Sequence, residues 1–196
     1  SNIQAASHGA ADRSLVFQDL DLPMRVLRDV VNDNTERILV DSRETYQKLQ
    51  DFASHYAVGA VQRIEHYQGE HPLFDMYNVE YEINKAMSRK VELKSGGYLI
   101  FDQTEALTTV DVNTGGFVTG RSLSDTIFKT NLEAAQCIAR QLRVRNLGGI
   151  IIIDFIDMDE EEQQSAVLAE LKKAVAKDRA RTGVNGFSAL GLVDMP

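Results

Sequence analysis

The chain begins with a polar stretch and then alternates helical patterns with strand patterns. Residues 1–14 are small and polar, which is typical of a tail or linker. From Pro23 onward, apolar residues recur at i, i+3 and i+4 and predict a first helix, whereas short β-rich runs predict strands. The elements expected in the first half are helices from Pro23, after Asp41 or Ser42 and over about 78–89, and strands at 37–40 and 61–66.

The second half repeats the alternation with longer elements. Its central feature is the run Ile150–Ile153, whose apolar character on both faces predicts a buried strand in a sheet covered on both sides. The other elements expected here are strands at 91–93, 98–102, 106–110 and 189–193, and helices over 125–146 and 159–182. This interleaving predicts an α/β fold in two subdomains that divide near residue 94.

Composition narrows the class of protein. The 196 residues are 43% hydrophobic and include one cysteine, which excludes a disordered chain, a disulfide framework and a zinc site built from several cysteines. No stretch reaches the roughly 18 apolar residues of a membrane span. The net charge of −8 disfavours a fold that grips nucleic acid by charge alone, and the low cysteine content fits a cytoplasmic location.

Two carboxylates stand where predicted buried strands end. Asp111 follows the run LTTV and Asp154 follows IIII. If these strands are parallel neighbours, the carboxylates meet at one sheet edge, where a hard cation such as Mg²⁺ would separate the like charges. Asn113 shares a face with Asp111 if its strand persists. The alternative is that each Asp caps a following turn, and Asp157 is expected to cap the 159–182 helix; the pattern alone leaves both interpretations of the pair open.

Three long motifs resemble those of the ribonuclease E/G family. They are ELKSGGYLIFDQTEALTTVDVNTGGFV, DTIFKTNLEAAQCIARQLRVRNLGGIIIIDFIDM and KDRARTGVNGFSALGLVDM, which together cover roughly residues 91–195. Residues 15 to about 89 resemble the family's preceding segment more loosely, through RVLRD, ILVDS and YQGEHPLFD. The motifs are nearer to the G branch of the family than to its E branch.

The resemblance implies an RNase H-like subdomain over 15–93 and a DNase I-like catalytic subdomain over 94–196. It further implies a Mg²⁺-dependent endoribonuclease, in which Mn²⁺ can substitute, that cuts single-stranded RNA in rRNA processing and mRNA decay and leaves 5′-phosphate and 3′-hydroxyl ends. The family's metal ligands fall on Asp111 and Asp154, and its supporting amide falls on Asn113. RNA contacts are expected at Arg181 and Arg179, in the motif KDRAR.

The resemblance also concerns what surrounds the matched segment. The family's S1 RNA-binding domain, its 5′-end sensor and its CPxC zinc-link are expected outside this sequence, so the chain is expected to be a weakly active or inactive catalytic fragment of a homo-oligomeric enzyme. Two alternatives stay open at this point. One is a non-catalytic RNA-scaffolding or dimerisation module, and the other is a Mg²⁺-dependent phosphohydrolase that acts on small molecules.

Overall fold

The computed structural model describes residues 19–115, 123–178, 180 and 182–196. The chain divides into two compact units between Tyr77 and Asn78. This division comes earlier than the one expected near residue 94, because the helix and strand that precede residue 94 pack with elements of the second unit. The expected tail at 1–14 lies outside the described residues.

The first unit is a small two-layer fold around a parallel strand pair. Its sheet consists of β1 (Ile38–Val40) and β2 (Ile64–His66), with Ile38 opposite Ile64. Its helices are α2 (Leu22–Asp29), α3 (Arg43–Tyr56), the 3₁₀ helix η1 (Val58–Arg63) and the short α4 (Leu73–Met76). Ser42 caps α3 by accepting a hydrogen bond from the backbone N–H of Thr45, as expected from the sequence. The strand expected over 61–66 is shorter, because its first three residues belong to η1.

The second unit is a five-stranded sheet with three helices. Its elements are α5 (Val79–Met87), β3 (Lys90–Glu92), β4 (Tyr98–Gln103), β5 (Leu107–Asn113), α6 (Leu123–Val144), β6 (Ile150–Asp154), α7 (Glu161–Val175) and β7 (Leu192–Met195). The strand order follows the chain, β3-β4-β5-β6-β7. Only β5 and β6 are parallel, and α6 lies in the crossover between them. The expected mixed α/β architecture is therefore confirmed, whereas the RNase H-like and DNase I-like assignments stay predictions.

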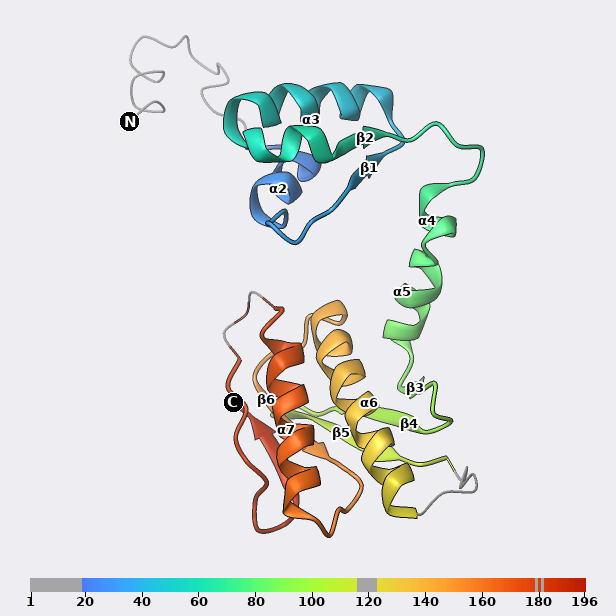
Figure 1. The fold of residues 1–196 in the computed structure, drawn as a ribbon, viewed down its shortest axis with the longest axis vertical. Coiled ribbons are helices and arrows are strands. Elements are labelled where there is room, and N and C mark those ends of the chain that lie inside the picture. Colours follow the sequence, from blue (N-terminus) through green and yellow to red (C-terminus); the bar gives the residue numbers. More distant parts are fainter. Residues whose placement is uncertain (1–18, 116–122, 179, 181) are drawn as a thin grey trace, which may run out of the picture. The chain divides into compact units, whose positions relative to one another are not determined.

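Helices α6 and α7 lie on the same face of this sheet (Figure 1). Strand residues that point toward them are buried, and the residues that alternate with them are more exposed, as in β5, where Val110 and Val112 are buried but Asp111 is exposed. Coverage on both faces, expected from the isoleucine run, is wrong for the described residues: Ile151 and Ile153 are buried, but Ile150 is 51% exposed. We call the less covered side the open face.

Two further expectations are corrected at the carboxyl-terminal end. Helix α7 ends at Val175, not near residue 182, so Lys177 lies beyond it. Asp157 does not cap this helix, since the N-cap position belongs to Glu160. Arg179 and Arg181 lie outside the described residues. Across the part of the chain that is described, no helix is long and apolar enough to cross a bilayer.

Candidate metal centre

The Asp111 and Asp154 side chains come from adjacent parallel strands at the same level. Their Cα atoms are register partners, the last such pair between β5 and β6. Both residues are exposed and alternate with buried neighbours, so both belong to the open face. The structure therefore brings together the two carboxylates that the strand-end pattern predicts, and the turn-cap alternative does not describe their arrangement.

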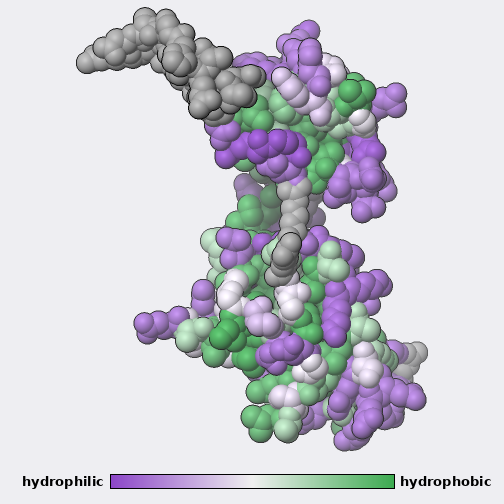
Figure 2. Space-filling model, turned by 90° about the vertical axis from the view of Figure 1, so that its left-hand side faces the viewer, coloured by the Kyte–Doolittle hydropathy of each residue, from purple (hydrophilic) through white to green (hydrophobic). Residues whose placement is uncertain are grey.

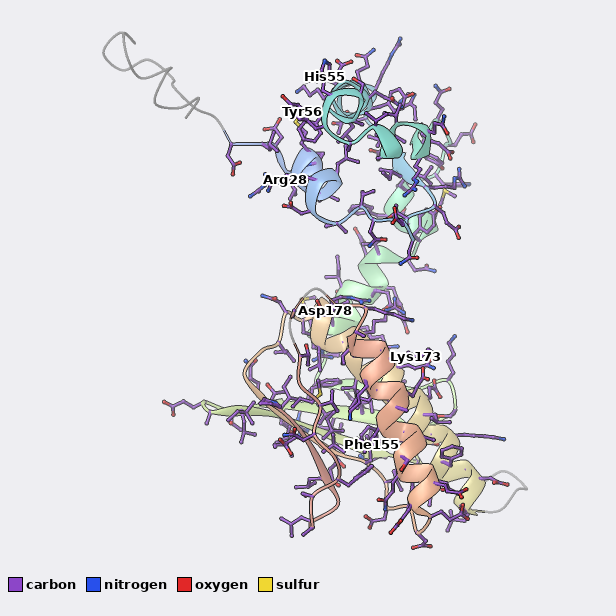
Figure 3. The ribbon with its side chains drawn as sticks, turned by 60° about the vertical axis from the view of Figure 1, so that its left-hand side comes forward. Arg28, His55, Tyr56, Phe155, Lys173 and Asp178 are labelled. Atoms are coloured by element: carbon purple, nitrogen blue, oxygen red, sulfur yellow. The ribbon has the colours of Figure 1, made fainter. Side chains whose placement is uncertain are left out.

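Burial of the neighbouring side chains fixes the direction in which Asp154 points. Ile153 is fully buried on the helix side, and Phe155 is 3% exposed. The Phe155 ring lies 6.1 Å from the Phe187 ring, centroid to centroid, and close to α7 (Figure 3). Because both neighbours of Asp154 are held in the core, the carboxylate between them is directed away from it.

Asn113 supports the Asp111 carboxylate. Strand β5 continues through Asn113, and its Nδ2 donates a hydrogen bond of 2.8 Å to Oδ2 of Asp111. This confirms the prediction that the two residues share a face. The amide holds one carboxylate oxygen in place and leaves the other oxygen for a ligand.

Apolar residues flank the two carboxylates along the strand register. Ile100 on β4 is the partner of Asp111, and Leu192 on β7 is the partner of Asp154. We call these four residues the carboxylate row. Loss of solvent raises the pKa of the Asp154 carboxyl above its ordinary value, and the nearby charges of Asp111 and Asp157 raise this pKa further. Within the described residues, neither carboxylate of the row forms an ion pair with a lysine, arginine or histidine.

The loop that leaves Asn113 is packed against a glycine turn. A Cβ atom added to Gly97 would lie 2.5 Å from the carbonyl oxygen of Asn113, and one added to Gly115 would collide with the carbonyl oxygen of Gly96. Gly115 also has a φ of +69°, a conformation that favours glycine. The carboxylate of Glu133 on α6 accepts hydrogen bonds from the backbone N–H groups of Lys94 and Ser95 in this turn. Helix α6 thus anchors the turn on which the backbone near Asn113 rests.

A buried amide fixes the segment after Asp154. Asn131 on α6 is 0% exposed; its Nδ2 donates to the carbonyl oxygen of Ile156 at 2.8 Å, and its Oδ1 accepts from the Ile156 N–H at 3.1 Å. Both backbone groups of Ile156 are therefore satisfied by one side chain two residues beyond the carboxylate. Helix α6 holds the chain close to each of the two aspartates.

The donor chemistry of this pair fits a hard divalent cation. Two carboxylates with few protein ligands match the way Mg²⁺ is usually held, with water and substrate oxygens completing its octahedron. Among the described residues, no group of three or more His, Cys, Asp or Glu side chains is arranged to hold a metal. Asp111 and Asp154 would hold the ion, and Asn113 would orient the first of them.

Comparison with known sequences identifies the family of this chain. The profile of the ribonuclease E/G family matches residues 1–196. The chain belongs to the ribonuclease E/G family. It is 60% identical to ribonuclease G of Escherichia coli K12 over 183 residues, which are 93% of this chain and 37% of that protein. It is 48% identical to ribonuclease G of Haemophilus influenzae over 93% of this chain and 37% of that protein, and 39% identical to ribonuclease E of the same organism over 98% and 21%. The chain thus spans about a third of the ribonuclease G length.

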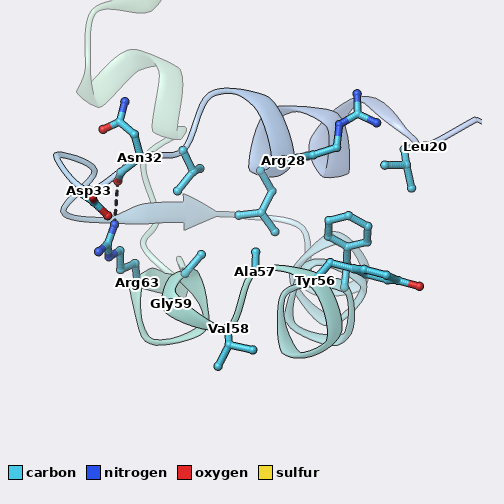
Figure 4. Close-up of a pocket in the computed structure, with 13 residues that line it drawn as sticks. Leu20, Arg28, Asn32, Asp33, Tyr56, Ala57, Val58, Gly59 and Arg63 are labelled. Atoms are coloured by element: carbon cyan, nitrogen blue, oxygen red, sulfur yellow. Dashed lines mark hydrogen bonds between the residues drawn. The ribbon is translucent and has the colours of Figure 1, made fainter.

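The first unit of this ribonuclease E/G family member has a cavity of its own. A cavity of about 730 Å³ lies between α2, the end of α3 and η1, with Tyr56 on one side and Arg63 on another (Figure 4). Arg63 donates a hydrogen bond to the backbone carbonyl of Asn32 at its edge. Every lining residue belongs to the first unit. Exposed hydrophobic side chains are interspersed with hydrophilic ones on both units, as Figure 2 shows for one face.

Two supporting residues of the site were not found by sequence reasoning. Asn131 and Glu133 lie on the helix predicted over 125–146. The only signal available there is a polar residue on the stripe of apolar residues that runs along one face of that helix. Asn131 does fall on that stripe, and a buried amide there implies a partner. Glu133 lies beside the stripe and gives no such signal.

The cysteine of the same helix, Cys137, is partly buried. This burial raises the pKa of its thiol, which disfavours a nucleophilic role.

Proposed function

We propose that this chain is the catalytic part of a Mg²⁺-dependent endoribonuclease that cleaves single-stranded RNA to leave 5′-phosphate and 3′-hydroxyl ends. The observation that supports it best is the register pairing of Asp111 with Asp154 on the open face. Membership of the ribonuclease E/G family and similarity to ribonuclease G support RNA as the substrate. We propose that the protein acts in the cytoplasm and that its substrates are rRNA and mRNA. A protein that contains this sequence and is as long as the ribonuclease G relatives would form homo-oligomers.

The roles of the residues follow from their surroundings. Bound Mg²⁺ would supply a Lewis acid for the scissile phosphate and a water of lowered pKa. Asp111 and Asp154 would bind that ion through their oxygens, and mutual repulsion of their charges favours its binding. Asn113 would keep Asp111 in one orientation. Ile100 and Leu192, at the two ends of the carboxylate row, would exclude water from its flanks and strengthen the electrostatic interactions inside.

The proposal can be tested by measuring RNA cleavage. The protein to use contains this sequence and is as long as the ribonuclease G relatives. We expect Asp154→Asn and Asp111→Asn to lower kcat/KM for a single-stranded oligoribonucleotide by about three orders of magnitude or more. Asn113→Ala should lower it by about 10- to 100-fold, since it removes only the support of a ligand. Glu105→Gln, which makes the same change of charge in the exposed turn between β4 and β5, is the control and should cleave normally.

Three outcomes would overturn the proposal. Wild-type cleavage by Asp154→Asn would mean that the pair does not hold the catalytic metal. Full RNA binding without any cleavage by the wild-type protein would favour the alternative, a non-catalytic RNA-scaffolding or dimerisation module. Turnover of a simple phosphodiester with no preference for RNA would instead indicate a small-molecule phosphohydrolase.

A further inference from the structure

An aromatic side chain adjoins the carboxylate row on the open face. Tyr98 begins β4 and is the register partner of Asn113, whose amide binds Asp111. Register partners on antiparallel strands have Cβ atoms about 4.5–5.5 Å apart on one face of the sheet. The ring of Tyr98 is half-buried, and the core below it is filled by its neighbour Leu99, which is fully buried. The protein core therefore does not account for an aromatic residue at position 98.

A cation accompanies this ring. Lys90 Nζ lies 4.2 Å from the centroid of the Tyr98 ring, and Lys90 is the register partner of Ile100 in the carboxylate row. The ammonium also pairs with Glu92 at 2.6 Å, but the Lys90 and Glu92 side chains are 50% and 66% exposed. An ion pair this exposed contributes little, so the ammonium remains available to another anion.

We propose that Tyr98 is a base-stacking platform for the nucleotide beside the scissile phosphate and that Lys90 contacts the phosphate of that nucleotide. The proposal rests on the proposed function and adds to it the way in which the substrate is positioned. Aromatic rings bind unpaired bases of any sequence by stacking, and lysine binds phosphate as a point charge. A base within a duplex remains stacked on its neighbours, so a platform at this position selects single-stranded RNA.

The geometry gives the platform a direction. Tyr98 and Lys90 lie on β4 and β3, on the Asp111 side of the metal pair, whereas Leu192 borders the other side. The RNA strand would therefore extend from the metal pair toward β3. Glu92 competes with the phosphate for Lys90, so the charge of Glu92 weakens RNA binding at this point.

The experiment combines variants with RNAs that lack one base. We would use the enzyme that contains this sequence and is as long as the ribonuclease G relatives. Its kcat/KM would be measured on a series of oligoribonucleotides in which each base in turn is replaced by an abasic ribose. Tyr98→Leu should lower kcat/KM on intact RNA by about 5- to 100-fold, whereas Tyr98→Phe should retain it. Tyr81→Leu, at an exposed tyrosine on α5, is the matched control. Urea unfolding of each variant measures any loss of stability separately.

The decisive readout is the loss of additivity at one position. In the wild type, one abasic site next to the cut should cause a clear loss of kcat/KM, and the same abasic site should cause no further loss in Tyr98→Leu. Lys90→Met should lower the slope of log KM against log salt concentration by about the amount that one phosphate contact contributes. Equal abasic losses in both enzymes at every position would overturn the platform alone, provided that Asp154→Asn is inactive. An active Asp154→Asn would overturn the proposed function itself.

Discussion

Asp111 and Asp154 face each other across the one parallel pair among the described strands of the second unit, as direct register partners. The remaining strand pairs of this sheet are antiparallel. In a parallel pair the carboxyl ends of both strands lie at the same edge, so Asp154, which ends β6, lies beside Asp111 near the end of β5. The α6 crossover makes this possible, because a parallel connection requires a long link between its strands.

Metal binding should depend on both carboxylates together. We expect Asp111→Asn or Asp154→Asn to weaken Mn²⁺ binding by the 196-residue chain at least tenfold, because each variant removes half of the protein's ligand charge. Titration followed by Mn²⁺ electron paramagnetic resonance measures this affinity. Glu105→Gln controls for the change in net charge. Unchanged affinity in both asparagine variants would place the ion elsewhere.

Stability should respond to pH through Asp154. Its pKa is raised in the folded state, so the folded chain binds this proton more tightly than the unfolded chain does. The free energy of unfolding therefore falls as the pH rises from the ordinary aspartate pKa, about 3.9, through the raised value. Asp154→Asn removes this penalty and should be more stable than the wild type at pH 7 without metal, by less than about 1 kcal/mol because the carboxylate is exposed.

Urea unfolding in EDTA at pH 4 and pH 7 measures this effect. The advantage of Asp154→Asn should be smaller at pH 4, where the wild-type carboxyl is more fully protonated. Added Mg²⁺ should stabilise the wild type and leave the variant unchanged. An advantage of equal size at both pH values would show that Asp154 titrates without any effect of its surroundings.

The strand-end carboxylates could be predicted from sequence, but the environment of the sheet could not. Side chains alternate along a strand, so Asp111 and Asn113 could be placed on one face, and the pairing of Asp111 with Asp154 was one of two interpretations that the pattern left open. Ile150 led to the wrong prediction that both faces of the sheet are covered. An isoleucine on an uncovered face cannot be distinguished in the sequence from an isoleucine in a core. Whether a second layer covers that face depends on packing partners that local periodicity does not encode.

Helix and domain boundaries were also less predictable than the elements themselves. The residues after Val175 include good helix formers, so propensity gives no reason for α7 to end there. The division at Tyr77 depends on the packing of α5 with β3 and with α6, and the contacts with α6 join residues that are far apart in the sequence. The register between the strands of the sheet could likewise not be predicted from the sequence, although it determines which side chains flank each carboxylate.

The loop position that packs against the glycine turn, Gly115, should not tolerate a side chain. We expect Gly115→Ala to lower the free energy of unfolding by about 1–3 kcal/mol, because the added Cβ meets the Gly96 carbonyl and the backbone has a positive φ. Gly148→Ala is the matched control, since nothing lies within 4 Å of its added Cβ. Chemical denaturation measures both. A Gly115→Ala variant as stable as the control would mean that the loop moves freely away from the turn.

The Asn131 amide should be among the costliest single side chains to replace in the second unit. Asn131→Leu leaves the N–H and C=O of Ile156 without their partner and should cost about 2–4 kcal/mol. Gln136→Leu, on the exposed side of the same helix, removes one exposed hydrogen bond to Glu170 and should cost less than about 0.5 kcal/mol. Similar losses of stability in the two variants would contradict a clamp on the segment after Asp154.

The crossover between β5 and β6 also determines when the metal pair forms. Asp111 and Asp154 are about forty residues apart, so on a ribosome that adds 5–20 residues per second Asp111 emerges ~2–8 s before its partner. Until α6 has formed and β6 has docked, Asp111 is an isolated carboxylate with little affinity for a divalent ion. Under the proposed function, Mg²⁺ would therefore not guide the early steps of folding and would only slow the unfolding of a sheet that is already assembled.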